Sequence, residues 1–149
     1  MNNSLAAFSG IFASALEDLA TELEEFPEEK LWVLPPGINN PGGSLFLHLC
    51  GNLRHFIGSS LGNTGYIRNR DYEFSARGLS KSEIRNLIQV TREEVINSLA
   101  NLNRLSPSDK FPFDNFGPDV SWLQGLMKIS THLSYHLGQI NYLRRILKG

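Results

Sequence analysis

The sequence predicts an all-α protein in which four helices form a bundle, within a single domain that spans residues 1–149. Four segments repeat apolar residues at three- and four-residue steps, which is the period of an amphipathic helix. No segment convincingly indicates a strand, because the short apolar stretch "LWVL" at 31–34 runs directly into two prolines. Four long helices bury their apolar faces by packing together, which predicts a helical bundle.

The first two predicted helices are separated by a long irregular connection. The first covers residues 5–26, and Pro27 ends it. Residues 27–43 contain several prolines and glycines, which exclude a continuous helix. We expect the second helix to begin at Ser44, a residue type that caps helices well, and to continue to about Leu61.

The third helix has a recognisable start. Residues 66–79 are predicted to form a loop, and Ser80 and Glu83 then have the spacing of a capping box. The apolar stripe that follows ends at Leu102. The sequence therefore predicts a third helix that begins beside Ser80.

The fourth helix is predicted from Asp119 or Ser121 to Gly149. The connections after the first three helices are long for a bundle. We expect them to cover one end of the bundle or to make contacts outside the protomer. Apolar loop segments such as "KFPFDNF" at 110–116 are consistent with an interface between two copies of the chain.

Composition excludes several classes of function. Hydrophobic residues make up 41% of the chain and charged residues 19%, and the net charge is −1, so an electrostatic site for nucleic acid or anionic lipid is not expected. No run approaches 18 apolar residues, and the N-terminal stretch lacks the basic region of a signal peptide. Cys50 is the only cysteine, which excludes an intramolecular disulfide. We expect a cytoplasmic protein without nucleic-acid or membrane partners.

Histidines on two predicted helices are the candidate functional residues. His132 and His136 are four residues apart, so they share one face of the fourth helix, and His48 lies on the second helix. Apolar neighbours flank this face, so the histidines should point partly inward and could face each other. Each buried polar group without a partner costs about 1–3 kcal/mol, whereas a divalent ion can bind three neutral imidazoles and keep coordination positions open. The alternative is a set of polar side chains packed between helices without a metal ion.

Other polar residues near these histidines have less specific interpretations. His55 is seven residues after His48, and we interpret it as a partly exposed residue near the helix end rather than a ligand. Cys50 lies about 200° around the helix from His48, which predicts a small core residue. Asn52 and Gln139 each lie one turn from a candidate ligand. They could fix the tautomer of a histidine, or they could be amides bonded between helices.

Three stretches together carry a resemblance to a known group of proteins. They are "GINNPGGSLFLHLCGNLRHFIG" at 37–58, "RNRDYEFS" at 68–75 and "THLSYHLGQINYLRRIL" at 131–147. With these stretches the chain resembles, over nearly its whole length, an uncharacterised subfamily of the DinB-like superfamily, which also contains YfiT-like proteins and mycothiol-dependent maleylpyruvate isomerases.

The resemblance implies a four-helix bundle of the DinB/YfiT-like type, a divalent metal such as zinc or nickel, and commonly a homodimer. The metal ligands of that group fall on His48, His132 and His136, and His55 falls where relatives often have another polar residue. Characterised relatives include transferases and isomerases that use a low-molecular-weight thiol, namely bacillithiol, mycothiol or glutathione. Many members have no known reaction.

Two classes of function remain open. In a metal-dependent enzyme, the ion would lower the pKa of a thiol for a transferase or isomerase reaction, or would activate water for hydrolysis. Arg68, Arg70 and Arg77 could then hold the carboxylates of the thiol, although ion pairs with Asp71 or Glu73 are an alternative. In a non-catalytic metal-binding or stress-response module, the ion would stabilise the bundle and the loops would mediate association. The chain lacks the glutamate of HExxH metalloproteases, which excludes that mechanism.

Overall fold

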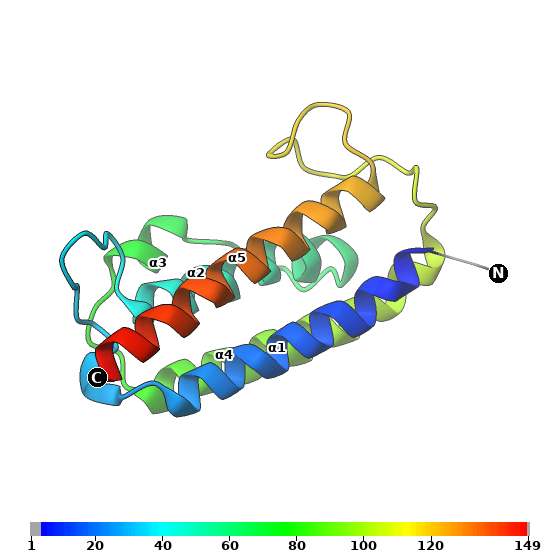
Figure 1. Ribbon diagram of the computed structural model, residues 1–149. Coiled ribbons are helices and arrows are strands. Elements are labelled where there is room, and N and C mark those ends of the chain that lie inside the picture. The colour runs from blue at the N-terminus through cyan, green and yellow to red at the C-terminus, as the bar shows by residue number, and fades with distance from the viewer. Residues whose placement is uncertain (1–3, 149) are drawn as a thin grey trace.

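The computed structural model describes residues 4–148, and within them every regular element is helical (Figure 1). The α-helices are α1 (Ala7–Glu25), α2 (Gly42–Leu53), α3 (Arg70–Ser75), α4 (Lys81–Leu99) and α5 (Trp122–Lys148). A π-helix, Arg54–Ser59, continues α2 directly, and short 3-10 helices cover Ser4–Ala6, Glu28–Lys30 and Ala100–Arg104. The four predicted helical segments are therefore present, and the predicted loop before α4 contains one further short helix.

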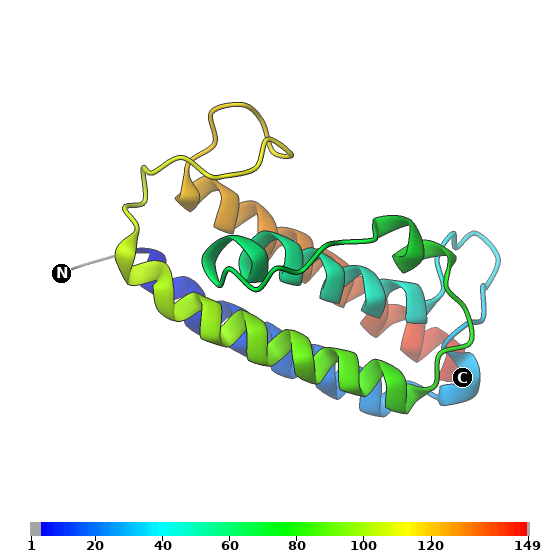
Figure 2. The ribbon, with the colours of Figure 1, turned by 180° about the vertical axis from the view of Figure 1, so that it is seen from behind.

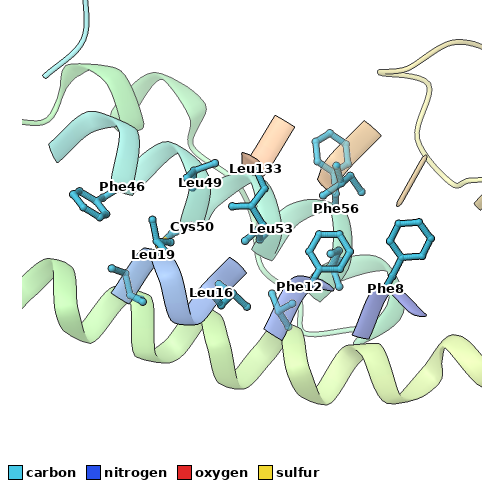
Figure 3. Packing of buried hydrophobic residues seen from close by; sticks show 14 of the residues in the cluster. Phe8, Phe12, Leu16, Leu19, Phe46, Leu49, Cys50, Leu53, Phe56 and Leu133 are labelled. Carbon is cyan, nitrogen blue, oxygen red and sulfur yellow. The ribbon is translucent and has the colours of Figure 1, made fainter. Parts of the chain in front are cut away.

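Four long helical segments share one core. The first, α1, packs against α4 and α5, and α2 packs against the same two helices. Figure 3 shows the labelled core side chains of α1 facing those of α2, its π-helical continuation and α5; they are Phe8, Phe12, Leu16 and Leu19 opposite Phe46, Leu49, Cys50, Leu53, Phe56 and Leu133. The periodic apolar residues that predict the helices therefore form the core between them.

The start of α4 is as predicted. The Ser80 hydroxyl accepts a hydrogen bond from the Glu83 amide at 3.1 Å, and the Glu83 carboxylate accepts one from the Ser80 amide at 2.7 Å. Ser121 and Gln124 make the same reciprocal pair before α5, at 3.2 and 2.9 Å. Of the two predicted starts for that helix, Ser121 is therefore the one that caps it. Its predicted last residue, Gly149, lies outside the described residues.

The predicted start of α2 is wrong by two residues. The helix begins at Gly42, after Pro41, and Ser44 is fully buried inside it. The two glycines let the preceding connection approach closely, because a Cβ at Gly42 would lie 2.6 Å from the Phe26 ring and one at Gly43 would lie 2.5 Å from the Trp32 ring. This packing is tertiary, so the capping preference of serine did not indicate it.

The direction of the helices explains the long connection before α4. Figures 1 and 2 show that α2 and α4 run in the same direction, and that α1 and α5 run in the opposite one. The chain after α2 therefore has to return along α2 before α4 begins, and this return carries α3 across α2. The Asn69 side chain caps α3 by accepting a hydrogen bond from the Tyr72 amide at 3.1 Å. The return path places α3 beside the candidate site.

Among the helices described between residues 4 and 148, none combines the length and the apolar character needed to cross a membrane.

Candidate metal centre

Three histidines from two helices converge on one point. His48 comes from α2, and His132 and His136 come from α5. Each offers a ring nitrogen that lies within 4.8 Å of the other two, and Nε2 of His48 is 3.1 Å from Nε2 of His132. The structure thus brings together the three residues that the sequence singles out, and we refer to them as the histidine site.

The spacing of these nitrogens fits one metal ion. Two nitrogens bound to a tetrahedral ion at about 2.0–2.1 Å lie about 3.3 Å from each other. The separation of 3.1 Å between the Nε2 atoms of His48 and His132 is close to that value. His136 completes the group through a ring whose centroid lies 4.5 Å from that of His132 and 4.9 Å from that of His48.

A buried carboxylate orients His48. Glu73 of α3 is only 3% exposed, and its Oε1 lies 2.9 Å from Nδ1 of His48. Arg68 donates two hydrogen bonds to the same carboxylate, each at 2.8 Å. Burial alone would raise the pKa of Glu73, but the hydrogen bonds from His48 and Arg68 outweigh burial and hold that pKa below its usual value. Glu73 is therefore an ionised acceptor at neutral pH.

The hydrogen bond to Glu73 sets the tautomer of His48. The guanidinium of Arg68 also lies 3.3 Å from Nδ1, but the Glu73 carboxylate is closer and is an acceptor only. The proton of neutral His48 is therefore on Nδ1, and the lone pair on Nε2 points toward His132. A carboxylate behind a ligating histidine is the arrangement that fixes the ring and raises its basicity in metal sites.

Gly51 makes the approach of Glu73 possible. It lies on α2 three residues after His48, and a Cβ built there would collide with the Glu73 carboxylate. From the sequence, Glu73 is predicted only as an ion-pair partner for loop arginines, and its contact with His48 is not predicted. A glycine within the helical pattern, one turn from a candidate ligand, is the signal that could have indicated a close approach there.

Gln139 supports His136 in a similar way. Its Oε1 lies 2.7 Å from Nδ1 of His136, so the amide oxygen accepts the Nδ1 proton and Nε2 is left as the free donor atom for a metal. Burial lowers the pKa of His136, and the bond to Gln139 acts in the opposite direction. Of the two interpretations considered for Gln139, contact with a candidate ligand is the one that the structure shows.

His132 and Asn52 carry the buried side-chain atoms without a hydrogen-bond partner in residues 4–148. They are Nδ1 of His132 and Oδ1 of Asn52. The pKa of His132 is lowered to about 4, mainly by burial and then by the charges of His136, His48, Arg68 and Arg70. His132 is therefore neutral at pH 7, as a metal ligand has to be. Asn52 is buried, but its oxygen is bonded to no histidine.

The three loop arginines have different surroundings. Arg68 forms the ion pair with Glu73 that was the alternative interpretation. Arg77 donates to the carbonyls of Phe74 and Ala76, at 2.9 and 2.8 Å, and so closes the end of α3. Arg70 is exposed and lies over the Phe74 ring, 5.1 Å from its centroid, and that ring is 4.8 Å from the His48 ring.

Arg70 is thus a positively charged side chain near the histidine site, and an anion can bind to it. Within the described residues it pairs with no carboxylate, in contrast to Arg68. Its charge is one of those that lower the pKa of His132. An anionic group bound at the histidine site would therefore find a positive charge beside it.

His55 and Cys50 lie apart from the histidine site, as the sequence predicts. His55 is half-buried between the rings of Phe56 and Phe113, at 4.8 and 4.6 Å, in an aromatic cluster. Cys50 is fully buried in the core, where burial raises its pKa to about 12. Its thiol is therefore protonated and inaccessible at neutral pH, which excludes it as a nucleophile.

A protein-family model matches most of the chain. The model of the family described as "Protein of unknown function (DUF1572)" matches residues 10–149, which include every residue of the histidine site and the supporting Glu73 and Gln139. No curated protein and no solved structure matches the chain.

Proposed function

We propose that this chain, which belongs to the DUF1572 family, binds one divalent metal ion through His48, His132 and His136 and acts as a metal-dependent enzyme. The observation that carries the proposal is the convergence of three imidazole nitrogens within 4.8 Å of one another. Two of these rings have their other nitrogen bonded to Glu73 and Gln139, which leaves the free lone pairs facing inward.

The three imidazole nitrogens of the histidine site favour an ion such as zinc or nickel. Imidazole nitrogens suit zinc, copper, iron and nickel, whereas magnesium and calcium prefer oxygen. The histidine site contributes nitrogen donors alone, because Glu73 is engaged with His48 and Arg68 behind the rings. We infer that zinc or nickel is the resident ion.

A catalytic role is supported by the number of ligands. Within residues 4–148, the group that could hold an ion has three members and no fourth histidine, cysteine or carboxylate. When bound by three protein ligands, such an ion keeps a coordination position open and lowers the pKa of a thiol or a water molecule there. A non-catalytic module would be favoured by a fourth protein ligand that closes the site.

The substrate class follows from the charges beside the site and from the resemblance to the DinB-like superfamily. We infer that the fold is a four-helix bundle of that type in one domain, and that the reaction is a transfer or isomerisation that uses a low-molecular-weight thiol. Arg70 would bind a carboxylate of the thiol, while Arg68 holds Glu73 in place. The nucleophilic sulfur has to arrive with the thiol, because Cys50 is buried.

A transfer assay tests this function. Metal-loaded wild type, Cys50→Ser and His48→Ala are compared with several small thiols and an electrophilic acceptor. We expect wild type and Cys50→Ser to be active and His48→Ala to be inactive. Inactivity of wild type with every thiol, in protein shown to hold its metal, would contradict the thiol-dependent reaction. Loss of activity in Cys50→Ser with metal retained would contradict the external nucleophile.

A further inference from the structure

A pocket of about 420 Å³ lies beside the histidine site. Its walls are the connection before α2, the first turn of α2 and the last part of α5, and they include Ile38, Leu45, Gln139, Tyr142 and Ile146. A volume of this size is within the range of pockets that hold small molecules.

The pocket continues from the histidine site along both helices. Leu45 precedes His48 by three residues on α2, and Gln139 follows His136 by three residues on α5, so these two wall residues each lie one turn from a histidine. Gln139 connects the pocket with the histidine site, because it lines the pocket and its Oε1 lies 2.7 Å from Nδ1 of His136. A molecule in the pocket therefore contacts a residue that is bonded to a candidate ligand.

The chemistry of the walls favours an uncharged, largely apolar ligand. Ile38, Tyr142 and Ile146 are 43%, 66% and 63% exposed, although all three are large and apolar. None of the residues that line the pocket is charged, and its polar groups are side-chain amides and a tyrosine hydroxyl. Exposed apolar side chains gathered around a concave site are typical of ligand-binding surfaces.

Hydrogen bonds within the protein hold one wall of the pocket in place. The amide of Ile38 donates to the carbonyl of Pro35 at 3.1 Å, and Gly37 has a φ of +82°, so residues 35–38, which include two prolines, form a tight turn. Trp32 anchors the start of this connection through a 2.9 Å hydrogen bond from its indole to the Leu79 carbonyl. A wall that is already ordered reduces the entropy lost on binding.

The pocket and Arg70 lie near different members of the histidine site. Arg70 stacks on Phe74, which contacts His48, and its charge acts on His132. The pocket instead adjoins His136 through Gln139. The histidine site therefore has a positive charge near His48 and His132, at Arg70, and an apolar pocket near His136, beside Gln139.

We propose that this pocket binds the uncharged, apolar part of the substrate that reacts at the histidine site, and that Ile38, Tyr142 and Ile146 are its contact residues. The proposal rests on the proposed function in one respect, since it assigns the pocket to the reaction at the metal ion. It adds the chemical class of the acceptor that reacts with the thiol, an uncharged apolar or aromatic small molecule.

Binding of a neutral fluorescent probe, N-phenyl-1-naphthylamine, tests the pocket. Wild type is compared with Ile146→Glu, which places a charge in the uncharged wall, and with Ile11→Glu as the matched control. Ile11 is 49% exposed on α1 and does not line the pocket. We expect Ile146→Glu to weaken probe binding by about 10-fold or more, because the bound probe would remove water from the new carboxylate, and Ile11→Glu to bind like wild type. Equal binding by all three proteins, or equal weakening in both variants, would overturn the proposal.

A second measurement tests whether a ligand in the pocket lies close to the metal ion. In cobalt-substituted protein, we expect the probe to change the visible spectrum of the ion in wild type and Ile11→Glu, and to change it much less in Ile146→Glu at the same, non-saturating concentration. An unchanged cobalt spectrum in wild type saturated with the probe would overturn the assignment of the pocket to the reaction. Failure of the protein to bind cobalt would instead contradict the proposed metal site, while probe binding to the metal-free protein would still decide whether the pocket accepts an apolar ligand.

Discussion

The buried carboxylate of Glu73 lies 2.9 Å from Nδ1 of His48, and this contact joins residues that are 25 positions apart in the chain. It directs the free nitrogen of His48 toward His132. Arg68 holds the same carboxylate from the other side. The short helix α3 therefore serves the histidine site, although it contributes no ligand to it.

Replacement of Glu73 by glutamine should lower metal affinity by about 10- to 100-fold, which is the usual effect of removing a partner behind a ligating histidine. The neutral amide cannot stabilise the His48 ring as a carboxylate does, and it leaves Arg68 without its ion pair. Competition with a chromogenic chelator measures the affinity. Glu94→Gln is the control, because it breaks a comparable pair with Arg54 that does not contact the histidine site. Equal losses in both variants would mean that Glu73 has no specific role.

Gly51→Ala should destabilise the protein by about 1–3 kcal/mol, since the new methyl group occupies the space of the Glu73 carboxylate. It should also weaken metal binding, because α3 or Glu73 has to move away from His48. Gly10→Ala in α1 is the matched control. A methyl group there meets nothing within 4 Å, and the change should stabilise the helix by up to about 1 kcal/mol. Urea unfolding measures both changes, and a Gly51→Ala protein as stable as wild type would contradict the close packing of α3 on α2.

The metal-free protein should lose stability as the pH falls from about 6.5 toward 4. The pKa of His132 is about 4 in the folded protein, because burial disfavours the charged ring, and it is about 6.5 in an unfolded chain. Between these values the unfolded state binds a proton that the folded state does not, so the free energy of unfolding rises with pH in this range. Unfolding curves between pH 7 and 5 should show a weaker pH dependence in His132→Gln than in wild type. The same slope in both proteins would show that His132 titrates normally.

Arg70→Gln should weaken the binding of a thiol that carries a carboxylate by about 2- to 5-fold, the value of an exposed ion pair. Cobalt-loaded protein allows the measurement, because a bound thiolate gives a charge-transfer band. We expect the variant to bind 3-mercaptopropionate more weakly than wild type does, and to bind 2-mercaptoethanol equally well. Arg104→Gln, at an exposed position outside the site, is the control. An equal effect on both thiols would argue against recognition of the carboxylate by Arg70.

The sequence predicted the parts of this site that follow helical periodicity. The spacing of His132 and His136 places them on one face, and the apolar residues around them predict that this face is turned inward. The capping pair at Ser80 and Glu83 likewise depends on residues three positions apart, and the structure confirms it. Such features can be predicted from the sequence because the residues that make the contacts are close together in the chain.

The parts that the sequence did not predict depend on contacts between distant segments. The helix α3 and the bond from Glu73 to His48 arise because the chain returns along α2, which no local pattern indicates. The start of α2 at Gly42 likewise depends on the Phe26 ring that packs on it. The homodimer, the cytoplasmic location and the absence of nucleic-acid partners stay predictions.

The metal content of wild type and His136→Ala tests the central claim most directly. Both proteins are purified without a chelating tag, loaded with zinc or nickel, dialysed and measured by elemental analysis, with helicity checked by circular dichroism. We expect about one ion per chain in wild type. In a folded His136→Ala protein we expect an affinity at least about 10-fold lower, since one of the three nitrogen donors is removed and the apolar core is intact. Equal metal content in the two proteins, or no bound metal in wild type, would contradict the assignment of the histidine site as a metal centre.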